Sequence, residues 1–439
     1  MNICVFGLWH LGTVTAACLA SSGRQVIGLD FDAQVIDALN KDRAPLFEPG
    51  LEELLHAGLS AGHLRFTTDA HNALAEADVV WVTYDTPVDD EDRADTAFVI
   101  ERVQGLFPDI AAGALVLLSS QLPVGSVADL ERRYTDRHPD KPVSFACTPE
   151  NLRLGQAIAA FTTPERVVVG VRDDRDKPRL AELFRPYTAR IEWMAVESAE
   201  MTKHALNAFL ATSVAFANEI ATLCEQVGAD ARAVARGLKS DIRIGPRAYL
   251  APGAAFAGGT LARDIAFLGA IGAAHNVPTH LLSAVRVSNE AHKLWTRKQL
   301  QALLGDLAGR RVAVWGLAYK PGTDTLRRSE AVALCRWLLA QGALVSAHDP
   351  VVTTLPADLS DKIDLTGTAL GALADAEALV VATPWPDFQA VSVDAMLTTM
   401  AEPNIVDPNR FLKQCRDQPA LHYVSVGNAD RTTPEIIQL

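Results

Sequence analysis

The stretch Gly253–Leu268, GAAFAGGTLARDIAFL, combines residue types that could do chemistry. Glycines and small residues come first. A hydroxyl on Thr260, a cation on Arg263 and an acid on Asp264 follow, and then an apolar run. Glycines admit close approach of a ligand to the backbone, and the apolar pattern after Asp264 predicts that a helix starts there. Such a loop suits an anion, because backbone amides and the helix dipole face it. By itself the stretch is better explained as a glycine-rich turn capped by Asp264.

A polar pair lies on a second segment, which is otherwise apolar. The pattern predicts a long helix from Glu197 to about Val227, and Lys203 and Asn207 are four residues apart on one of its faces. A polar pair on such a helix needs a partner. The pair can also be explained as a hydrogen-bonded core amide beside a lysine whose stem is buried. The segment alone favours this second explanation.

The N-terminal residues have the layout of a dinucleotide-binding unit. The strand Asn2–Phe6 leads through the turn GLWHLG (7–12) into an alanine-rich helix, and a second strand, Gln25–Leu29, ends at Asp30. The helix N-terminus would face a pyrophosphate, and the acid would hold the adenosine ribose hydroxyls. This layout predicts NAD, since an acid would repel the 2′-phosphate of NADP.

The glycine pattern of the turn is incomplete. Gly7 would make the tight turn and Gly12 would let the helix pack on the strand, but the middle glycine is replaced by Trp9. His10, the next residue, is better explained as a local phosphate or water contact than as a catalyst. A broken pattern is a weak signal, and its position at the start of the chain with Asp30 at the right distance supports it.

The rest of the chain alternates strand and helix on either side of a helical middle. Further strands are expected at 79–83, 115–119, 143–147 and 167–171, and a second α/β unit starts near Arg310 with the strand and glycine turn RRVAVWGLAYK. We therefore predict an α/β protein with two Rossmann-like, doubly wound α/β domains joined by a central helical segment. The expected boundaries are an NAD-binding domain at 1–190, a helical connector and dimerisation domain at 191–300, and a nucleotide-sugar-binding domain at 301–439.

Composition excludes several classes of partner. Of 439 residues, 49% are hydrophobic, and the formal net charge is −13, which argues against a nucleic-acid or anionic-membrane surface. The six cysteines are scattered without a CxxC pair, as expected of reduced core residues in a cytoplasmic protein. The histidines form no ligand cluster, so no metal site is expected. A strand at the very start argues against a signal peptide, and no uncharged apolar run is long enough to span a membrane.

The order of motifs resembles that of the UDP-glucose/GDP-mannose dehydrogenase family along essentially the whole chain. The matching motifs are GLWHLG (7–12), EPGLEELL (48–55), TPENLRLG (148–155), AEMTKHALNAFLA (199–211), NEIATLCEQVGAD (218–230), RIGPRAYL (243–250), FAGGTLARD (256–264), GLAYKPGTDTLRRS (316–329) and VVATPWPDF (380–388). Several long motifs in one order are far more specific than any single motif.

This resemblance implies an activity. Members of the family oxidise the C6 alcohol of a nucleotide sugar twice, using two NAD, and supply precursors for polysaccharides. Their active cysteine forms a thiohemiacetal with the C6 aldehyde, which is oxidised to a thioester and hydrolysed. The substrate here is expected to be a UDP-sugar, and the long helix makes a homodimer the natural expectation.

The resemblance also implies roles for individual residues. Lys203, Asn207 and Asp264 would surround C6, and Glu150 would be the general base. The expected cofactor contacts are Gly7, Trp9, His10, Leu11, Gly12, Asp30, Thr86, Pro87, Gln121, Arg263 and Arg327. The expected substrate contacts are Glu150, Leu152, Arg153, Lys203, Asn207, Arg243, Tyr249, Phe256, Gly258, Gly259 and Lys320.

Thr260 stands where the family has its nucleophilic cysteine. A threonine hydroxyl titrates far above a thiol, and no neighbour plainly supplies a base, so thioester chemistry is impossible at this position. Other departures from the family pattern are Gln121 for Thr, Asn151 for Phe, Leu154 for an acid, Arg263 for Lys, Thr325 for Asp and Arg328 for Glu. Random decay of an inactive enzyme should have replaced the other expected catalytic residues as readily as the nucleophile. Lys203, Asn207, Asp264 and Glu150 are all present, which favours an altered active site over a decayed one.

Three functions are compatible with these residues. The first is NAD-dependent oxidation at C6, with any second step passing through the hydrated aldehyde. The second is an epimerase or isomerase that retains its NAD and gives product without net NADH. The third is a non-catalytic sugar-nucleotide-binding homologue, which would follow if Trp9 blocked the cofactor site.

Overall fold

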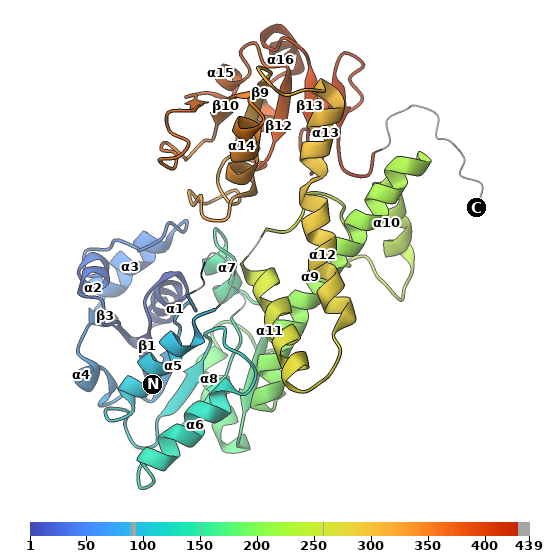
Figure 1. Cartoon of the computed structure of the whole chain (residues 1–439). Coiled ribbons are helices and arrows are strands. Elements are labelled where there is room, and N and C mark those ends of the chain that lie inside the picture. The colour runs from blue at the N-terminus through green and yellow to red at the C-terminus, as the bar shows by residue number, and fades with distance from the viewer. Residues whose placement is uncertain (88, 90–93, 151, 258, 429–439) are drawn as a thin grey trace. The chain divides into compact units, whose positions relative to one another are not determined.

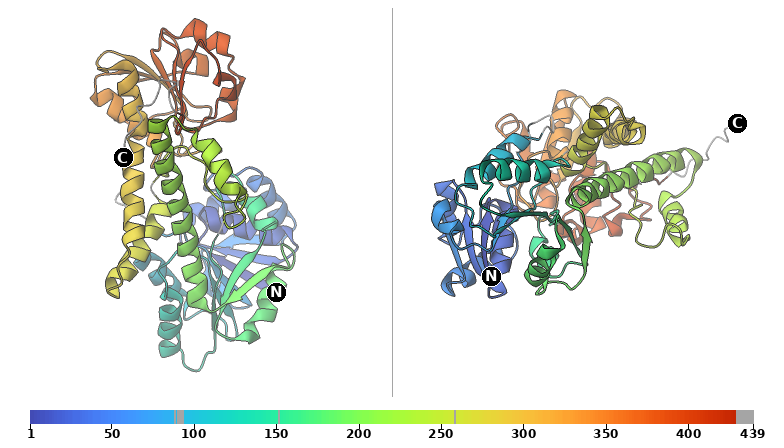
Figure 2. Two further views of the ribbon diagram at one scale, coloured as in Figure 1. Left: turned by 90° about the vertical axis from the view of Figure 1, so that its right-hand side faces the viewer. Right: turned by 90° about the horizontal axis from the view of Figure 1, so that it is seen from below.

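The computed structural model describes residues 1–87, 89, 94–150, 152–257 and 259–428, and the contacts within it divide the chain into two compact units, 1–206 and 207–439 (Figure 1). Helix α9 (Val196–Val227) begins in the first unit and ends in the second, and Figure 2 shows it as one unbroken helix. The three expected domain boundaries remain a proposal.

The first unit contains an eight-stranded sheet in the order β3-β2-β1-β4-β5-β6-β7-β8, parallel except for the β6–β7 pair. Its strands are β1 (Asn2–Phe6), β2 (Gln25–Leu29), β3 (Leu64–Thr67), β4 (Val79–Val82), β5 (Leu115–Leu118), β6 (Ser144–Cys147), β7 (Val167–Val171) and β8 (Ile191–Met194). Its helices are α1 (His10–Ser21), α2 (Ala33–Leu39), α3 (Leu51–Ser60), α4 (Ala70–Leu74), α5 (Thr96–Leu106), α6 (Ser126–Arg137), α7 (Ala157–Thr162), η1 (Asp174–Asp176) and α8 (Lys177–Phe184).

Both faces of this sheet are buried. Along β1, Ile3 and Val5 pack into one apolar cluster, while Cys4 and Phe6 pack into another on the opposite face. Successive side chains of a strand point to opposite faces, so a strand covered by helices on both sides is apolar throughout. The continuous apolar run NICVF therefore became a central parallel strand, as the sequence predicted.

The second unit contains a six-stranded, all-parallel sheet in the order β11-β10-β9-β12-β13-β14. Its strands are β9 (Arg311–Trp315), β10 (Leu344–His348), β11 (Ile363–Leu365), β12 (Ala378–Val381), β13 (Asn404–Val406) and β14 (His422–Val424). Its helices besides α9 are α10 (Ala231–Ser240), α11 (Thr260–Ala274), α12 (His280–Lys293), α13 (Trp295–Leu304), α14 (Glu330–Ala340), α15 (Ala369–Ala372), η2 (Pro386–Ala390), α16 (Val393–Thr399) and η3 (Lys413–Cys415).

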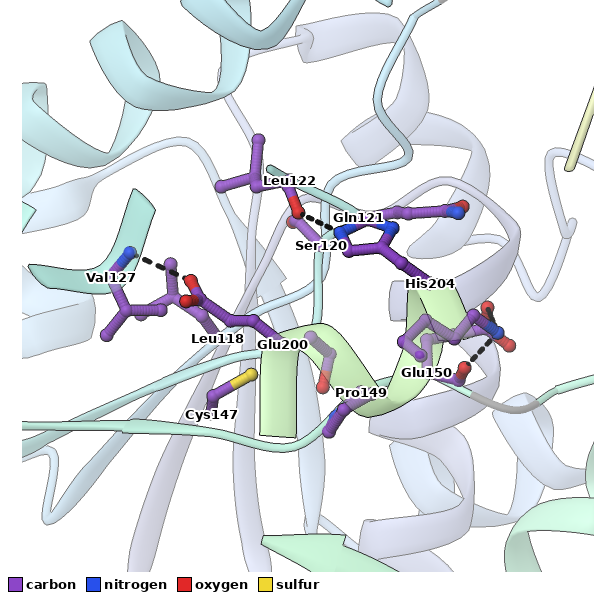
Figure 3. Close-up of a pocket in the computed structure, with 12 residues that line it drawn as sticks. Leu118, Ser120, Gln121, Leu122, Val127, Cys147, Pro149, Glu150, Glu200 and His204 are labelled. Atoms are coloured by element: carbon purple, nitrogen blue, oxygen red, sulfur yellow. Dashed lines mark hydrogen bonds and ion pairs between the residues drawn. The ribbon is translucent and has the colours of Figure 1, made fainter. Parts of the chain in front are cut away.

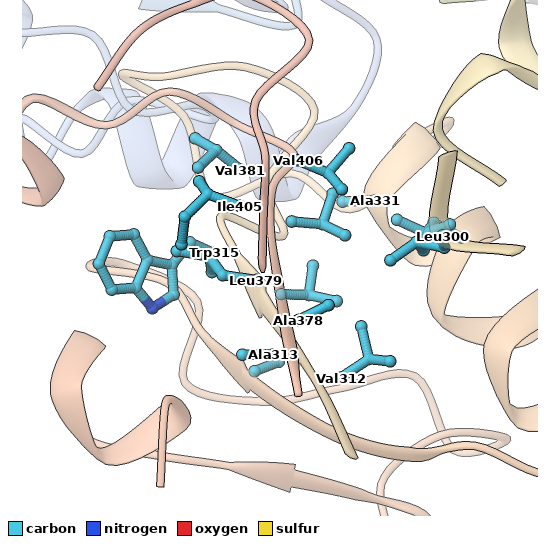
Figure 4. Close-up of a cluster of buried hydrophobic side chains, with 14 of the residues drawn as sticks. Leu300, Val312, Ala313, Trp315, Ala331, Ala378, Leu379, Val381, Ile405 and Val406 are labelled. Carbon is cyan, nitrogen blue, oxygen red and sulfur yellow. The ribbon is translucent and has the colours of Figure 1, made fainter. Parts of the chain in front are cut away.

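One apolar cluster forms the core around this sheet (Figure 4). Trp315, at the end of β9, is fully buried and stacks on Phe388 with ring centroids 4.9 Å apart. Leu300 from α13 and Ala331 from α14 belong to the same cluster, so helices before and after β9 cover the strands. Two Rossmann-like α/β sheets with helices between them in the sequence confirm the predicted fold class.

The expected start of helix α11 was wrong. The helix begins at Thr260, and Gly259, with φ +98°, precedes it without a side-chain cap. Asp264 is therefore the fifth residue of the helix and is fully buried, so it is not the cap of a glycine-rich turn. The apolar periodicity began only after the polar residues Thr260, Arg263 and Asp264, which is why the helix start was placed one turn too late.

Candidate active site

The turn between β1 and α1 has the geometry that a dinucleotide turn needs. Gly7 has φ +95°, and a Cβ there would lie 2.7 Å from the Tyr84 ring. A Cβ on Gly12 would lie 1.8 Å from the carbonyl oxygen of Gly7, so a side chain would push the helix away from the turn. Both glycines are thus required by close packing. Leu11, which was expected to contact the cofactor, is buried.

Asp30 follows β2 and is buried beside this turn. Its Oδ2 accepts a hydrogen bond from the Leu8 amide at 2.7 Å, and its Oδ1 accepts from the Asp32 amide at 3.1 Å and from the Tyr84 hydroxyl at 3.4 Å. The acid therefore fixes the turn as well as marking the end of the strand. Each carboxylate oxygen has two lone pairs, so acceptor capacity remains for a ribose hydroxyl.

Trp9 replaces the middle glycine without backbone strain. Its φ is −79°, a value open to any L-residue, and the residue is 48% exposed. Trp9 is also the N-cap residue of α1 and makes no side-chain cap hydrogen bond, so the first amides of this helix have no side-chain cap. These amides and the two glycines fit the pyrophosphate of NAD, and the bulk of Trp9 is the feature that departs from the pattern.

His10 connects this turn to a buried acid that the sequence analysis did not single out. The Nε2 of His10 lies 2.9 Å from Oε2 of Glu48, which is 4% exposed. The same carboxylate accepts hydrogen bonds from the amides of Gly155 at 2.7 Å and Ala157 at 2.8 Å. Glu48 thereby joins the dinucleotide turn, the EPGL motif and the end of the TPENLRLG motif. The only sign in the sequence that Glu48 matters is its place in the motif EPGLEELL. That motif does not show which distant residues Glu48 contacts.

A small cavity lies at the carboxyl ends of β5 and β6 (Figure 3). Its volume of about 20 Å³ is room for roughly one water molecule. It is lined by Leu118, Ser119, Ser120, Gln121, Leu122, Val127, Cys147, Pro149, Glu150, Glu200, Lys203 and His204. Ligands of open α/β sheets bind at this edge, where three of the expected site residues now lie together.

Lys203 and Glu150 are paired beside this cavity. The Lys203 Nζ donates a hydrogen bond to the Glu150 carbonyl oxygen at 2.5 Å and lies 3.7 Å from its carboxylate Oε2. Both side chains are partly exposed, at 11% and 23%. The structure thus brings together the expected base and the expected lysine.

The first turns of α9 also hold the loop on the other side of the cavity. Glu200 accepts hydrogen bonds from the amides of Gly125 at 2.7 Å and Val127 at 3.0 Å, and His204 Nε2 lies 2.9 Å from the Leu122 carbonyl oxygen. Burial raises the pKa of Glu200 more than these amides lower it. The sequence analysis missed Glu200, because an acid on a long amphipathic helix is usually solvated.

Thr86 and Pro87 lie near this loop, at the end of the chain segment that follows β4. The Thr86 hydroxyl donates a hydrogen bond to the Gln121 carbonyl oxygen at 2.7 Å, so two of the expected cofactor residues are in contact. Pro87 is exposed.

In the second unit, Asn207 and Asp264 form a buried pair. The Asn207 side-chain amide donates a hydrogen bond to Oδ2 of Asp264, and the two residues are 5% and 0% exposed. Thr260 is exposed at the first position of α11, and Arg263 is partly buried one turn later. A carboxylate buried in this way is held in place by the amide, which suits a positioning role for both residues.

The loop before α11 is held by two asparagines. Asn289 accepts from the Phe256 amide at 3.0 Å and donates to its carbonyl oxygen at 2.8 Å, while Asn218 accepts from the Gly253 amide at 3.0 Å. Gly259 leaves room for a guanidinium, since a Cβ there would lie 3.1 Å from Nη1 of Arg328. The sequence analysis missed both asparagines, because their partners are backbone atoms of a distant loop.

Other expected site residues lie at the surface. Arg243 is exposed and pairs with Asp241 through Nη2 and Oδ2 at 2.6 Å, and Tyr249 is 60% exposed. Arg153 and Arg327 are also exposed. Leu152 and Lys320 are partly buried. Gly258 and Asn151 lie outside the described residues.

Cysteine and metal chemistry receive no support from the described residues. All six cysteines are free and buried. Burial raises the pKa of Cys4, Cys18, Cys335 and Cys415 to about 12, so a thiolate is disfavoured there. Cys147 lines the small cavity, and burial raises its pKa too. No group of three His, Cys, Asp or Glu side chains that could hold a metal occurs in the described part of the chain.

One helix of the described residues is long and apolar enough to cross a membrane by length and composition. This is α9, whose most apolar 18-residue window has a mean hydropathy of 1.2 and is 44% buried. The helix also carries Glu200, Lys203 and Asn207, which bond to protein groups. A core helix meets the same criteria.

Two Rossmann-like sheets, one with a dinucleotide turn followed by an acid, define the class: a dinucleotide-dependent oxidoreductase. Three domain descriptions of one family match the chain in order. They are the UDP-glucose/GDP-mannose dehydrogenase family NAD binding domain at residues 1–188, its central domain at 197–291 and its UDP binding domain at 313–414.

Relatives match over nearly the full length. The chain is 34% identical to UDP-glucose 6-dehydrogenase of Rhizobium meliloti (strain 1021), covering 98% of this chain and 100% of that protein. It is 34% identical to UDP-glucose 6-dehydrogenase YwqF of Bacillus subtilis (strain 168), covering 97% and 98%. A solved UDP-glucose dehydrogenase from Pyrobaculum islandicum is 30% identical, with a TM-score of 0.86 and 98% of each chain covered.

The chain belongs to the UDP-glucose/GDP-mannose dehydrogenase family. It is an NAD-dependent oxidoreductase of nucleotide sugars, as the resemblance of its motifs implied.

Proposed function

We propose that the protein oxidises the C6 alcohol of a UDP-sugar for polysaccharide precursor synthesis, without a thioester intermediate. The observation that carries this proposal is the composition of the α11 N-terminus. Thr260 occupies the nucleophile position there, exposed and without a described basic partner that could activate it, while Asp264 one turn later is buried and paired with Asn207. The residues expected to position the substrate, Asn207 and Asp264, are thus present, whereas the nucleophilic cysteine of the family is absent.

The cofactor fits the first unit through the α1 amides, the two glycines and Asp30. When bound, NAD supplies a hydride acceptor. The residues of this chain manage the protons: Glu150 Oε2 accepts the proton of the substrate hydroxyl or of a water, and Lys203 Nζ, 3.7 Å away, stabilises the negative charge. A second oxidation would use water added to the aldehyde: the hydrate takes the place of the thiohemiacetal, and loss of a hydride to a second NAD and of a proton gives the carboxylate directly.

The decisive experiment uses purified protein, NAD and UDP-glucose, with absorbance at the NADH band and mass spectrometry of the sugar. NADH together with an aldehyde or a uronate supports the proposal, and a changed sugar without NADH overturns it in favour of the epimerase alternative. The relatives are dehydrogenases, so neither that alternative nor a purely binding homologue is favoured.

Lys203→Ala tests the assignment of the proton-managing pair. The variant should lower kcat at least about 100-fold, since it removes one charged group from the reacting centre. Lys362→Ala, at an exposed position in the second unit, is the matched control and should behave like the wild type. Equal rates for both variants would remove Lys203 from the mechanism.

A homodimer is part of the same proposal. On α9, Phe209, Phe216 and Leu223 are 68%, 46% and 61% exposed and follow one another at seven-residue spacing. This spacing places them along one stripe of the helix, where a second copy of the chain would cover them. Sedimentation of the wild type and of Phe216→Glu should distinguish a dimer from a monomer. We also propose a soluble, cytoplasmic enzyme, with the domain boundaries at 190 and 300.

A further inference from the structure

Three arginines from separate segments converge on one turn of the second unit. The turn is Asn409–Arg410, shortly after β13. The Arg232 Nη2, from α10, donates a hydrogen bond to the Asn409 carbonyl oxygen at 2.6 Å. The Arg416 guanidinium, just after η3, donates to the carbonyl oxygen of Arg410. Two guanidinium groups are therefore held by successive carbonyls, and the third belongs to the turn itself.

Asp230 and Asp407 are acids next to this cluster. Arg410 Nη1 lies 3.6 Å from Oδ1 of Asp230. Asp407 is fully buried, but its Oδ2 accepts from the Leu412 amide and the Tyr423 hydroxyl, each at 2.7 Å. The other carboxylate oxygen of Asp407, Oδ1, is buried and makes no hydrogen bond to any described residue.

Each of the three guanidinium groups retains an unused donor. The Nε atoms of Arg232, Arg410 and Arg416 are buried and make no hydrogen bond to any described residue. Buried donors normally have partners, so three orphaned Nε atoms in one cluster call for an explanation. The pKa of Arg232 is lowered, first by burial and then by the charges of Arg410 and Arg416, which outweigh the opposing effect of Asp407.

A cavity of about 320 Å³ lies against this cluster. Its lining includes Arg410, Arg416, Gln418, His422, Tyr423 and Asn428. Asp417 is the acid that faces the same space. The volume falls in the range of small-ligand sites. Guanidinium groups match pairs of oxygens on phosphate or carboxylate in a way that ammonium groups do not.

The turn that carries Arg410 is also strained. Its φ is +54°, in the left-handed region that glycine and asparagine adopt more readily than arginine. Such strain occurs preferentially at binding sites, where a required side chain offsets the cost. An arginine here supplies a charge that asparagine, the residue favoured by the backbone, would not.

We propose that this arginine cavity binds the phosphate group of a small ligand. The site contains none of the residues assigned above to the cofactor, the substrate or the catalytic step. It therefore predicts a phosphate-binding capacity that the dehydrogenase reaction does not require. Free phosphate and a phosphorylated sugar share the chemistry that the two guanidinium groups lining the cavity, those of Arg410 and Arg416, recognise.

Isothermal titration calorimetry with inorganic phosphate, and separately with glucose 1-phosphate, tests the proposal on the full-length protein in saturating NAD and UDP. The wild type should bind one equivalent of at least one probe. Arg416→Gln and Arg410→Asn should each weaken binding about tenfold or more, because each removes one charge. Arg410→Asn also suits the left-handed backbone, so loss of folding would not explain its effect.

Arg336→Gln is the matched control. Arg336 lies on α14 in the same unit, pairs with Asp358 and is outside the cavity lining, so its replacement should leave phosphate binding unchanged. Tighter binding of glucose 1-phosphate than of phosphate would support the proposal and identify an esterified ligand, whereas equal binding would support it with a free anion. Absence of binding with NAD and UDP present, or equal binding by all variants, would overturn it.

Discussion

The side-chain amide of Asn207 donates a hydrogen bond to the carboxylate of Asp264, and both groups are buried. This bond links the middle of α9 to the second turn of α11 and holds the carboxylate in one orientation. Because a buried carboxylate without its donor is costly, the pair is a structural requirement as well as a candidate part of the active site.

Asn207→Leu should therefore destabilise the protein and inactivate it. The substitution removes one hydrogen bond from a buried carboxylate, at a cost of about 1–3 kcal/mol in the free energy of unfolding. Urea unfolding and NADH formation measure the two effects. Asn207→Asp/Asp264→Asn, which exchanges the two groups, should recover stability more than activity, and recovery of neither would contradict the pairing.

Thr260→Cys should introduce the thioester chemistry that our proposal excludes for the wild type. A thiol at the exposed start of α11 can attack an aldehyde, so this variant should form uronate and two NADH per sugar faster than the wild type. Thr260→Ala should retain the first oxidation within a factor of about three, since the hydroxyl is not a nucleophile in our proposal. A large loss in Thr260→Ala would instead make the threonine a participant in the first step.

Trp9→Gly should strengthen NAD binding by about an order of magnitude. The indole stands where the family pattern has a glycine, next to the α1 amides, and its removal opens the approach of the pyrophosphate. The shift in melting temperature with increasing NAD measures the change. A weaker response in the variant would mean that the indole stacks on the cofactor. Trp193→Phe, at a position on β8 away from the turn, is a suitable control.

Glu200→Gln should change the pH dependence of stability. The pKa of Glu200 is raised in the folded protein by burial, above the ordinary value of about 4.3. Its contribution to stability is therefore complete below that value and is lost as the pH rises through the folded pKa. The free energy of unfolding of the wild type relative to Glu200→Gln should fall as the pH rises from about 4 to 7. An unchanged difference across this range would exclude a raised pKa.

The fold could be predicted from the sequence because its strands are continuous apolar runs. NICVF and QVIGL became β1 and β2 with the expected bounds, since central strands of a covered parallel sheet are apolar on both faces. The start of α11 could not be placed correctly, because helix position was inferred from apolar spacing and its first turn is polar.

The candidate site was predictable only where a motif names the residue. Lys203 and Glu150 were both expected at the reacting carbon, and Lys203 Nζ lies 3.7 Å from Glu150 Oε2. Glu48 and Glu200 escaped prediction because each is buried by partners that are backbone amides far away in the sequence. No pattern of side-chain types encodes such partners, and only the folded chain brings them together.

The unbroken course of α9 sets a fixed distance inside the protein. Lys203 and Asn207 are four residues apart on this helix, so the rise of 1.5 Å per residue separates them by about 6 Å along its axis. Hinge motions leave such a spacing unchanged, because a helix interior neither stretches nor slips. The separation along the axis therefore depends on the helix alone, and changes in the loops around α9 would leave it as it is.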